Sequence, residues 1–249
     1  MGDGSPQRNH NQDLNAVEMT SLSSSRKDSA RPDVLPTDEK APLQPNRTFY
    51  IVPHTGFTKA IQVLDLTPQI KERIPYNGFT DAYKKAVKEL AETSPPEPTY
   101  IITRQNWVAS RMIVTSASGA ELAAWKAPHW SPGTTTLTFP ANSPHCSHTI
   151  EMKPVGFWHR AEYFVKDSVT YTWEMESRLT SSAFTLFKTI GHKKVEVARY
   201  AQSFGFTTGG TLILDTREVD ELVVVLTCAA MLKKKRLRDH EYANSGAGY

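Results

Sequence analysis

The most apolar stretch of the chain runs from Leu222 to Leu232 and contains one polar residue, Thr227. A helix that is apolar on every side is either buried on every side or inserted in a membrane. A helix spanning this stretch would rise only about 16 Å, whereas the hydrocarbon core of a bilayer is about 30 Å thick. The pattern therefore predicts a helix buried inside the protein, and it predicts no transmembrane segment.

Charged residues flank this apolar stretch in a fixed order. Acids precede it (Asp215, Glu218, Asp220 and Glu221) and bases follow it (Lys233, Lys234, Lys235, Arg236 and Arg238). Acids first and bases last is the order that complements a helix dipole. Asp215 and Glu218 also have the spacing of a capping box, which predicts that they begin the helix.

Most of the remaining chain has the two-residue alternation of β-strands. Tyr171, Trp173 and Met175 alternate with Thr172, Glu174 and Glu176, as in a strand with one wet face. Roughly ten to twelve such runs at hairpin spacing indicate a barrel or a sandwich. They are 48–53, 60–66, 100–104, 111–115, 122–126, 134–139, 149–153, 157–166, 171–176, 184–189, 194–200 and 211–214.

One segment among the strands has helical periodicity. Between Thr80 and Glu92, apolar residues recur at helical spacing, with lysines and glutamates on the other face. Ser94-Pro95-Pro96 then ends the segment. The pattern predicts an amphipathic helix that lies on the surface of the domain.

The first 46 residues differ in composition from the rest. They contain no Phe, Trp or Tyr and hold five of the sixteen prolines. Such a segment buries too little apolar area to offset its ordering entropy. The predicted organisation is therefore a disordered arm over 1–46, a β-barrel domain over 47–242 and a flexible tail over 243–249.

Charge and cysteine content narrow the class of protein. The net charge is +3, and the arm holds seven acids against five bases, so the domain carries about +5, concentrated at 233–238. This total is too small to predict nucleic-acid binding. Two cysteines, Cys146 and Cys228, are not a disulfide framework. Together with the lack of an apolar signal segment near Met1, this favours a reducing, cytoplasmic location, with peripheral membrane association as an option.

A meander of about twelve strands followed by an apolar helix resembles the tubby C-terminal-like superfamily, which includes tubby proteins, phospholipid scramblases and LURP-one-related proteins. Gly209-Gly210-Thr211-Leu212-Ile213-Leu214-Asp215 is similar to the last strand leading into that helix, here Val219–Leu232. The chain also resembles fungal members of the group. The resemblance implies a closed antiparallel barrel around a central hydrophobic helix. It assigns no site residue, because the scramblase cysteine cluster and acidic calcium-binding segment have no counterpart here.

The basic cluster is the one candidate binding site. Lys233, Lys234, Lys235, Arg236 and Arg238 are expected to project beyond the buried stretch and to bind anionic lipid headgroups, or else only to cap the helix. The predicted function is non-enzymatic binding, at an anionic membrane surface or to a protein partner. The alternative is a carrier that holds a small apolar ligand inside the barrel.

Other chemistry-bearing residues are assigned structural roles. His129, His145, Cys146 and His148 lack a recognised metal-ligand spacing, so no metal site is predicted. The glycine-rich segment 205–210 is predicted to be a hairpin turn. Glu151, Glu162, Glu174 and Glu176 are placed on wet strand faces, and Trp158, Phe164, Tyr171 and Trp173 in the core. Ser21, Ser23, Ser24 and Ser25 are either linker or phosphorylation sites. The sequence predicts no catalytic residue and no cofactor.

Overall fold

The computed structural model describes residues 43–54, 58–75, 79–106, 110–128, 133–156, 161–175, 183–203 and 208–245, with side chains described as far as Asp239. The chain divides into two compact units, Met1–Arg31 and Pro32–Tyr249, and every described residue belongs to the second.

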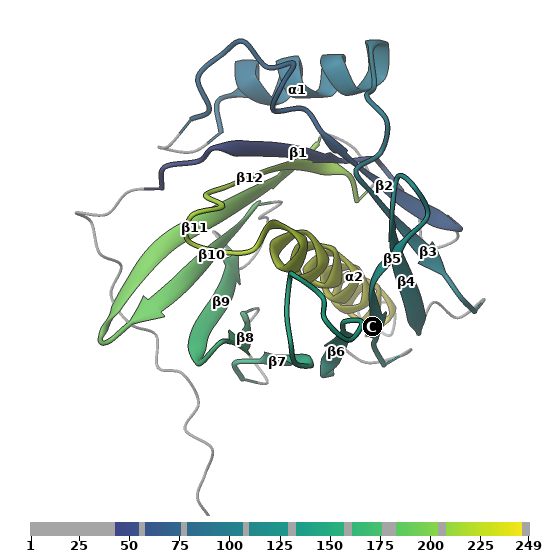
Figure 1. Ribbon diagram of the computed structural model, residues 1–249, viewed down its shortest axis with the longest axis vertical. Helices are drawn as coiled ribbons and strands as arrows, with labels where there is room; N and C mark the ends of the chain where they lie inside the picture. The colour runs from purple at the N-terminus through teal and green to yellow at the C-terminus, as the bar shows by residue number, and fades with distance from the viewer. Residues whose placement is uncertain are drawn as a thin grey trace, which may run out of the picture. The chain divides into compact units, whose positions relative to one another are not determined.

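The second unit contains a closed barrel of twelve antiparallel strands, in which each strand pairs with its sequence neighbours and β1 pairs with β12 to close the ring (Figure 1). This confirms the predicted mainly-β, closed antiparallel barrel. The strands are β1 (Arg47–Ile51), β2 (Ala60–Asp65), β3 (Tyr100–Arg104), β4 (Arg111–Ser116), β5 (Glu121–Lys126), β6 (Thr135–Thr138), β7 (Ile150–Pro154), β8 (Glu162–Lys166), β9 (Val169–Met175), β10 (Ala183–Ile190), β11 (Lys193–Gln202) and β12 (Gly210–Leu214).

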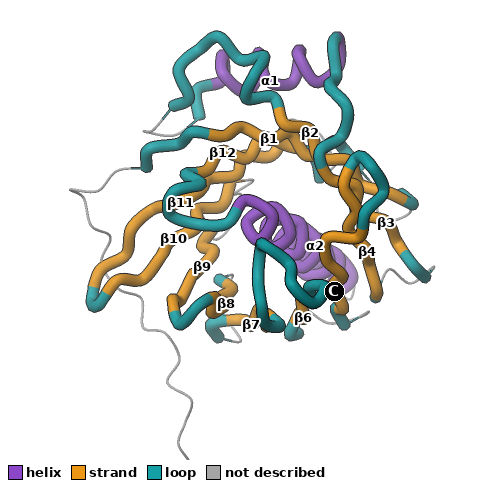
Figure 2. The backbone as a smooth tube through the Cα atoms, in the orientation of Figure 1, coloured by secondary structure: helices purple, strands orange, loops and turns teal. Residues whose placement is uncertain are grey.

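The C-terminal helix α2 (Glu221–Ser245) runs through the ring, as Figures 1 and 2 both show. Every residue from Leu222 to Leu232 is buried. The apolar side chains of this stretch belong to the same core cluster as inward-facing strand residues such as Val114, Phe164 and Leu212. The barrel core is therefore formed between the strands and α2, which is why α2 is apolar all round.

Thr227, the one polar residue of the apolar stretch, has a partner inside the barrel. The indole Nε1 of Trp173 donates a hydrogen bond of 3.0 Å to its hydroxyl. The hydroxyl in turn donates to the Val223 carbonyl, 2.8 Å away and one helical turn earlier. A buried tryptophan needs an acceptor for its N–H, so Thr227 allows a large aromatic residue to pack in the interior at no cost in unpaired polar groups.

The second helix, α1 (Asp81–Thr93), packs on the outside of the barrel (Figure 2). Thr80 caps it by accepting a hydrogen bond of 3.1 Å from the Tyr83 N–H. Its buried face forms a separate apolar cluster with β1, β2 and β12, through Tyr50, Leu64 and Ile213. The predicted amphipathic surface helix is confirmed.

The start of α2 differs from the predicted capping box. The cap is Asp220, whose Oδ1 accepts a hydrogen bond of 3.0 Å from the Val223 N–H. Asp215 is instead bound by Arg217, through the backbone N–H at 3.0 Å and the guanidinium Nε at 2.8 Å. Arg217 occupies the Asp215 carboxylate, which therefore does not cap the helix. The predicted capping box is wrong, and α2 begins later, at Glu221.

The predicted domain boundaries also change at both ends. Leu43 is buried, and the N–H of Asn46 donates to the Leu214 carbonyl at 3.0 Å. Residues 43–46 thus belong to the folded domain rather than to the arm. At the other end, α2 continues to Ser245, so 243–245 are helical and not a flexible tail. Residues 1–42 and 246–249 lie outside the described residues.

Candidate functional site

The contacts of α2 distinguish the two ends of the barrel. Where α2 begins, Glu221 accepts a hydrogen bond of 2.6 Å from the hydroxyl of Tyr100, the first residue of β3. Where α2 leaves, Lys234 contacts Glu162, the first residue of β8. Because neighbouring strands are antiparallel, odd-numbered strands start and even-numbered strands end where α2 begins. We call this the proximal end, and the end where α2 leaves the distal end.

A buried ion cluster ties α2 to the barrel wall at the distal end. Lys234 Nζ lies 2.6 Å from Glu162 Oε2, and these side chains are 3% and 0% exposed. Arg238, one turn further along α2, pairs with the other oxygen, Glu162 Oε1. The backbone carbonyl of Met152 on β7 lies 3.4 Å from Lys234 Nζ. Two cations of α2 thus share one carboxylate of β8.

Burial has opposite effects on the two principal partners. It raises the pKa of the Glu162 carboxyl, and the attraction of Lys234 and Arg238 offsets part of that rise. It lowers the pKa of the Lys234 ammonium, and Glu162 counteracts part of that fall. Removing charged groups from water is costly even when they are paired. The cluster therefore fixes the position of α2 inside the ring. The desolvation cost of each buried charge is offset only by its oppositely charged partners.

The remaining bases of the cluster have different surroundings. Burial lowers the pKa of Lys233 to about 8. Lys235 forms an ion pair of 2.6 Å with Asp239, one helical turn later. Arg236 is exposed, and its charge adds to the burial that lowers the pKa of His54. Since Arg236 comes two residues after Lys234, helical periodicity places it on the opposite side of α2 from Glu162.

Two expectations about these residues are wrong. Lys234 does not project past the buried stretch, because helical periodicity turns it inward towards β8. Glu162 does not lie on a wet strand face, since it is completely buried. The sequence does contain one indication that Glu162 is buried. It is two residues from Phe164, a predicted core residue, so the two side chains lie on the same face of the strand.

The candidate metal ligands do not converge on one site. At the proximal end, His145 Nδ1 lies 3.1 Å from Asp220 Oδ2, the carboxylate that caps α2. The Cys146 thiol donates to the His148 carbonyl at 3.2 Å, and its sulfur lies 3.7 Å from His148 Nδ1. Across the part of the chain that the structure describes, no group of three ligand-type residues could hold a metal ion. His129 lies outside the described residues.

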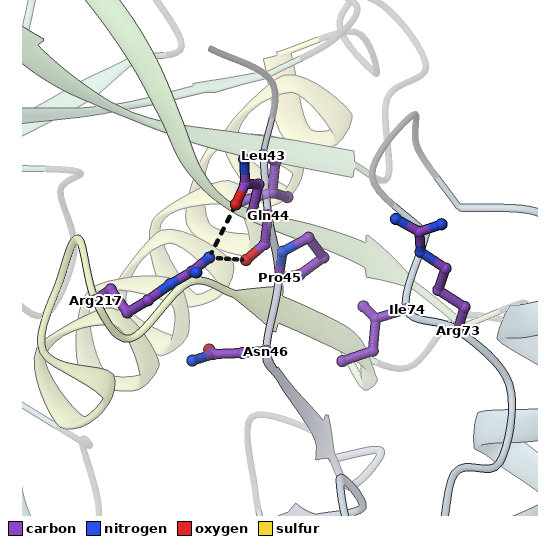
Figure 3. Close-up of a pocket in the computed structure, with 7 residues that line it drawn as sticks. All are labelled: Leu43, Gln44, Pro45, Asn46, Arg73, Ile74 and Arg217. Carbon is purple, nitrogen blue, oxygen red and sulfur yellow. Dashed lines mark hydrogen bonds between the residues drawn. The ribbon is translucent and has the colours of Figure 1, made fainter.

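An open pocket of about 600 Å³ lies between the segment before β1, the β2–α1 connection and the β12–α2 connection (Figure 3). Arg73 and Arg217 are its charged residues, and the Arg217 guanidinium is already paired with Asp215 and donates to the Gln44 carbonyl at 3.0 Å. The pocket is lined by Leu43, Gln44, Pro45, Asn46, Arg73, Ile74 and Arg217. It brings together none of the residues singled out from the sequence.

The other sequence candidates have structural partners. Glu151 pairs with Lys153 at 2.7 Å and Glu174 with Lys194 at 2.6 Å. The rings of Phe164 and Tyr171 stack with their centroids 5.2 Å apart, as core packing requires. β11 and β12 pair antiparallel with Gln202 opposite Gly210, and residues 205–207 of the predicted turn lie outside the described residues. The remaining candidates, Trp158, Glu176 and the four serines of 21–25, lie outside the described residues.

Comparison of the chain with protein-family models, with curated proteins and with solved structures finds no match in any of the three. The resemblance to the tubby-like superfamily therefore remains a prediction. Within the described ranges, neither helix combines the length and hydrophobicity needed to cross a bilayer.

Proposed function

We propose that this chain is a non-enzymatic binding protein that docks peripherally on an anionic membrane surface through the distal end of α2. The observation that carries the proposal is the exposed position of Arg236 just beyond the buried stretch of α2. Lys233 and Lys235 flank it in sequence. A basic residue near an anionic leaflet contributes about 1 kcal/mol of binding energy, so a few such residues support reversible association.

Within this proposal the basic cluster has two separate roles. Lys234 and Arg238 are engaged by Glu162 and hold α2 in the barrel. The lipid-facing set is centred on the exposed Arg236, together with Lys235, for which Asp239 competes. One short basic run would thus both anchor the helix and present a cationic surface.

The carrier hypothesis receives less support than membrane binding. A pocket for a small ligand is typically about 300–1,000 Å³ of concave, mostly apolar space. In the interior of this barrel that position is taken by α2, whose apolar side chains pack against the strands. A protein partner for the distal end is the alternative outcome of the experiment below.

The test is vesicle flotation with the full chain at low and high salt. The parent protein should float with vesicles rich in phosphatidylserine, should not float with zwitterionic vesicles, and should be released as salt screens exposed charges beyond about 8 Å. The variant Lys235→Glu/Arg236→Glu should lose most of this binding. The matched control, Lys71→Glu/Lys85→Glu, makes the same charge change at exposed positions before and within α1.

A thermal melt of each variant accompanies the binding assay, so that loss of fold is not mistaken for loss of binding. Equal losses in the variant and the control would show that only total charge matters and would contradict the assignment to α2. A parent protein that fails to bind anionic vesicles at low salt would overturn the proposed function and leave a protein partner as the remaining hypothesis.

A further inference from the structure

From the strand register, we infer that the distal end carries a second cationic surface, which docks with α2 on the same anionic bilayer. Four neighbouring strands each have a base at this end. They are Lys59, directly before β2, Arg104, the last residue of β3, Arg111, the first residue of β4, and Lys126, the last residue of β5. We call these four residues the cationic row. The inference rests on the proposed function and gives it a surface and an orientation.

Backbone pairing fixes the row as one continuous feature. The N–H of Arg104 donates to the Lys59 carbonyl at 2.9 Å, which joins the first two strands. The N–H of Gln105, the next residue, donates to the Arg111 carbonyl at 3.0 Å, which adds the third. Arg111 and Lys126 are then direct partners across β4 and β5. With neighbouring strands about 4.8 Å apart, the row spans about 14 Å of the rim.

The row is costly for the isolated protein. Arg111 and Lys126 are both exposed and stand directly opposite one another, and like charges in that position destabilise a sheet. Within the described residues, neither of them, nor Lys59, forms an ion pair with an acid, in contrast to the bases of α2 that bind Glu162 and Asp239. An external anion would supply the missing compensation.

The acids around the start of α2, at the proximal end, already have basic partners: Asp65 and Glu221 contact Arg47, and Glu218 contacts Lys188. At the distal end the row adds to the exposed Arg236. Lys234 faces β8, and Arg236 comes two residues later, so helical periodicity turns it towards the opposite wall of the twelve-strand ring, where β2 lies. The row and Arg236 therefore form one cationic sector of the rim.

An extended anionic plane is the occupant that this arrangement fits. The cations lie at the same end of successive strands of a closed ring. Arg104 pairs with the buried Met112 and lies on the inner face of the barrel, whereas Arg111 and Lys126 lie on its outer face. Both sets reach the same rim, where a flat surface would meet the barrel. The barrel should dock with its distal end towards the headgroups and its proximal end towards water.

The sequence alone does not reveal this surface, because its members are spread between residues 59 and 126 and form no basic run.

The decisive variant is Arg111→Gln/Lys126→Gln, tested as full-length protein on phosphatidylserine-rich vesicles at low salt. We expect about a thirtyfold weaker partition, the loss of two cations near an anionic leaflet. The matched control is Lys71→Gln/Lys85→Gln, at exposed positions before and within α1.

Stability provides a second readout that a structural role would not reproduce. Neutralising two like charges that face each other should leave the melting temperature unchanged or raise it, while binding falls. If these residues instead stabilised the fold, the substitutions would lower both the melting temperature and vesicle binding. A row variant that binds vesicles as tightly as the parent would overturn the row and leave the proposed function standing.

Orientation is tested with an environment-sensitive label at single added cysteines. Thr134→Cys, directly before β6, lies at the distal end, and Ser118→Cys, in the β4–β5 turn, lies at the proximal end; both positions are exposed. Only the distal label should report a less polar environment on vesicles. A response at the proximal label alone would overturn the docking geometry. Tighter binding to single-stranded RNA than to vesicles would overturn the membrane as the occupant.

Discussion

The ion pair between Lys234 and Glu162 gives the sharpest prediction for stability. Lys234→Met keeps the length and apolar volume of the side chain but removes the cation 2.6 Å from a carboxylate that is 0% exposed. Breaking a buried pair from one side costs about 3–5 kcal/mol, because the other charge stays buried without compensation. Since Arg238 still binds Glu162, we expect the lower end, about 3 kcal/mol.

The neighbouring residue supplies the control. Lys235→Met removes a pair of the same length, 2.6 Å, but its side chains are 22% and 46% exposed. Such exposed pairs contribute about 0.3–0.5 kcal/mol. Urea unfolding of both variants and the parent measures the difference. Similar losses for Lys234→Met and Lys235→Met would refute the buried cluster.

The pH dependence has a defined sign. The pKa of Glu162 is raised above its ordinary value of 4.5 in the folded protein. Its contribution to stability is therefore largest below that value and is lost as the pH rises through the folded-state pKa. Without Lys234, the folded-state pKa rises further, so the deficit of Lys234→Met should grow as the pH is raised from about 4.5. A deficit that shrinks over this range would contradict the argument.

Three further substitutions test the interior helix, each by its effect on the free energy of unfolding in urea. Thr227→Val should cost about 1–3 kcal/mol, since it leaves the indole N–H of Trp173 buried without an acceptor; a neutral effect would argue against that hydrogen bond. Asp220→Ala should cost about 1 kcal/mol through loss of the α2 cap, and no loss would place the cap elsewhere. Val225→Asp should prevent folding because it buries an unpaired carboxylate, whereas Leu90→Asp on α1 should be tolerated, and equal effects would contradict the assignment of the two helices.

The architecture could be predicted because each level of the sequence agrees with it. The eleven residues from Leu222 to Leu232 are too few to span a membrane and too apolar for a helix on the protein surface. The runs of alternating residues predicted the strands that surround this helix. Helix and strand periodicity are local properties of the sequence, so they can be recognised without knowing the tertiary contacts.

The site could not be predicted to the same extent, because its partners are remote in sequence. Glu162 and Lys234 are 72 residues apart, and no local pattern reports that the helix turns Lys234 towards β8. The facing of Arg111 and Lys126 depends on the register of β4 against β5, which includes a bulge beyond Val114. The capping box failed for a related reason, because Arg217 competes for Asp215.

The position of α2 at the end of the described domain has a consequence for synthesis. The ring closes only when β1 pairs with β12, where Arg47 lies opposite Leu214, and its interior is filled only by the residues that follow. A chain emerging from the ribosome therefore carries eleven strands that can neither close nor bury their inner faces. Such long-range pairing makes folding slow and exposes apolar strands to aggregation meanwhile. A nonsense mutation that removes only the last strand and helix should thus yield an aggregating chain rather than a shortened barrel.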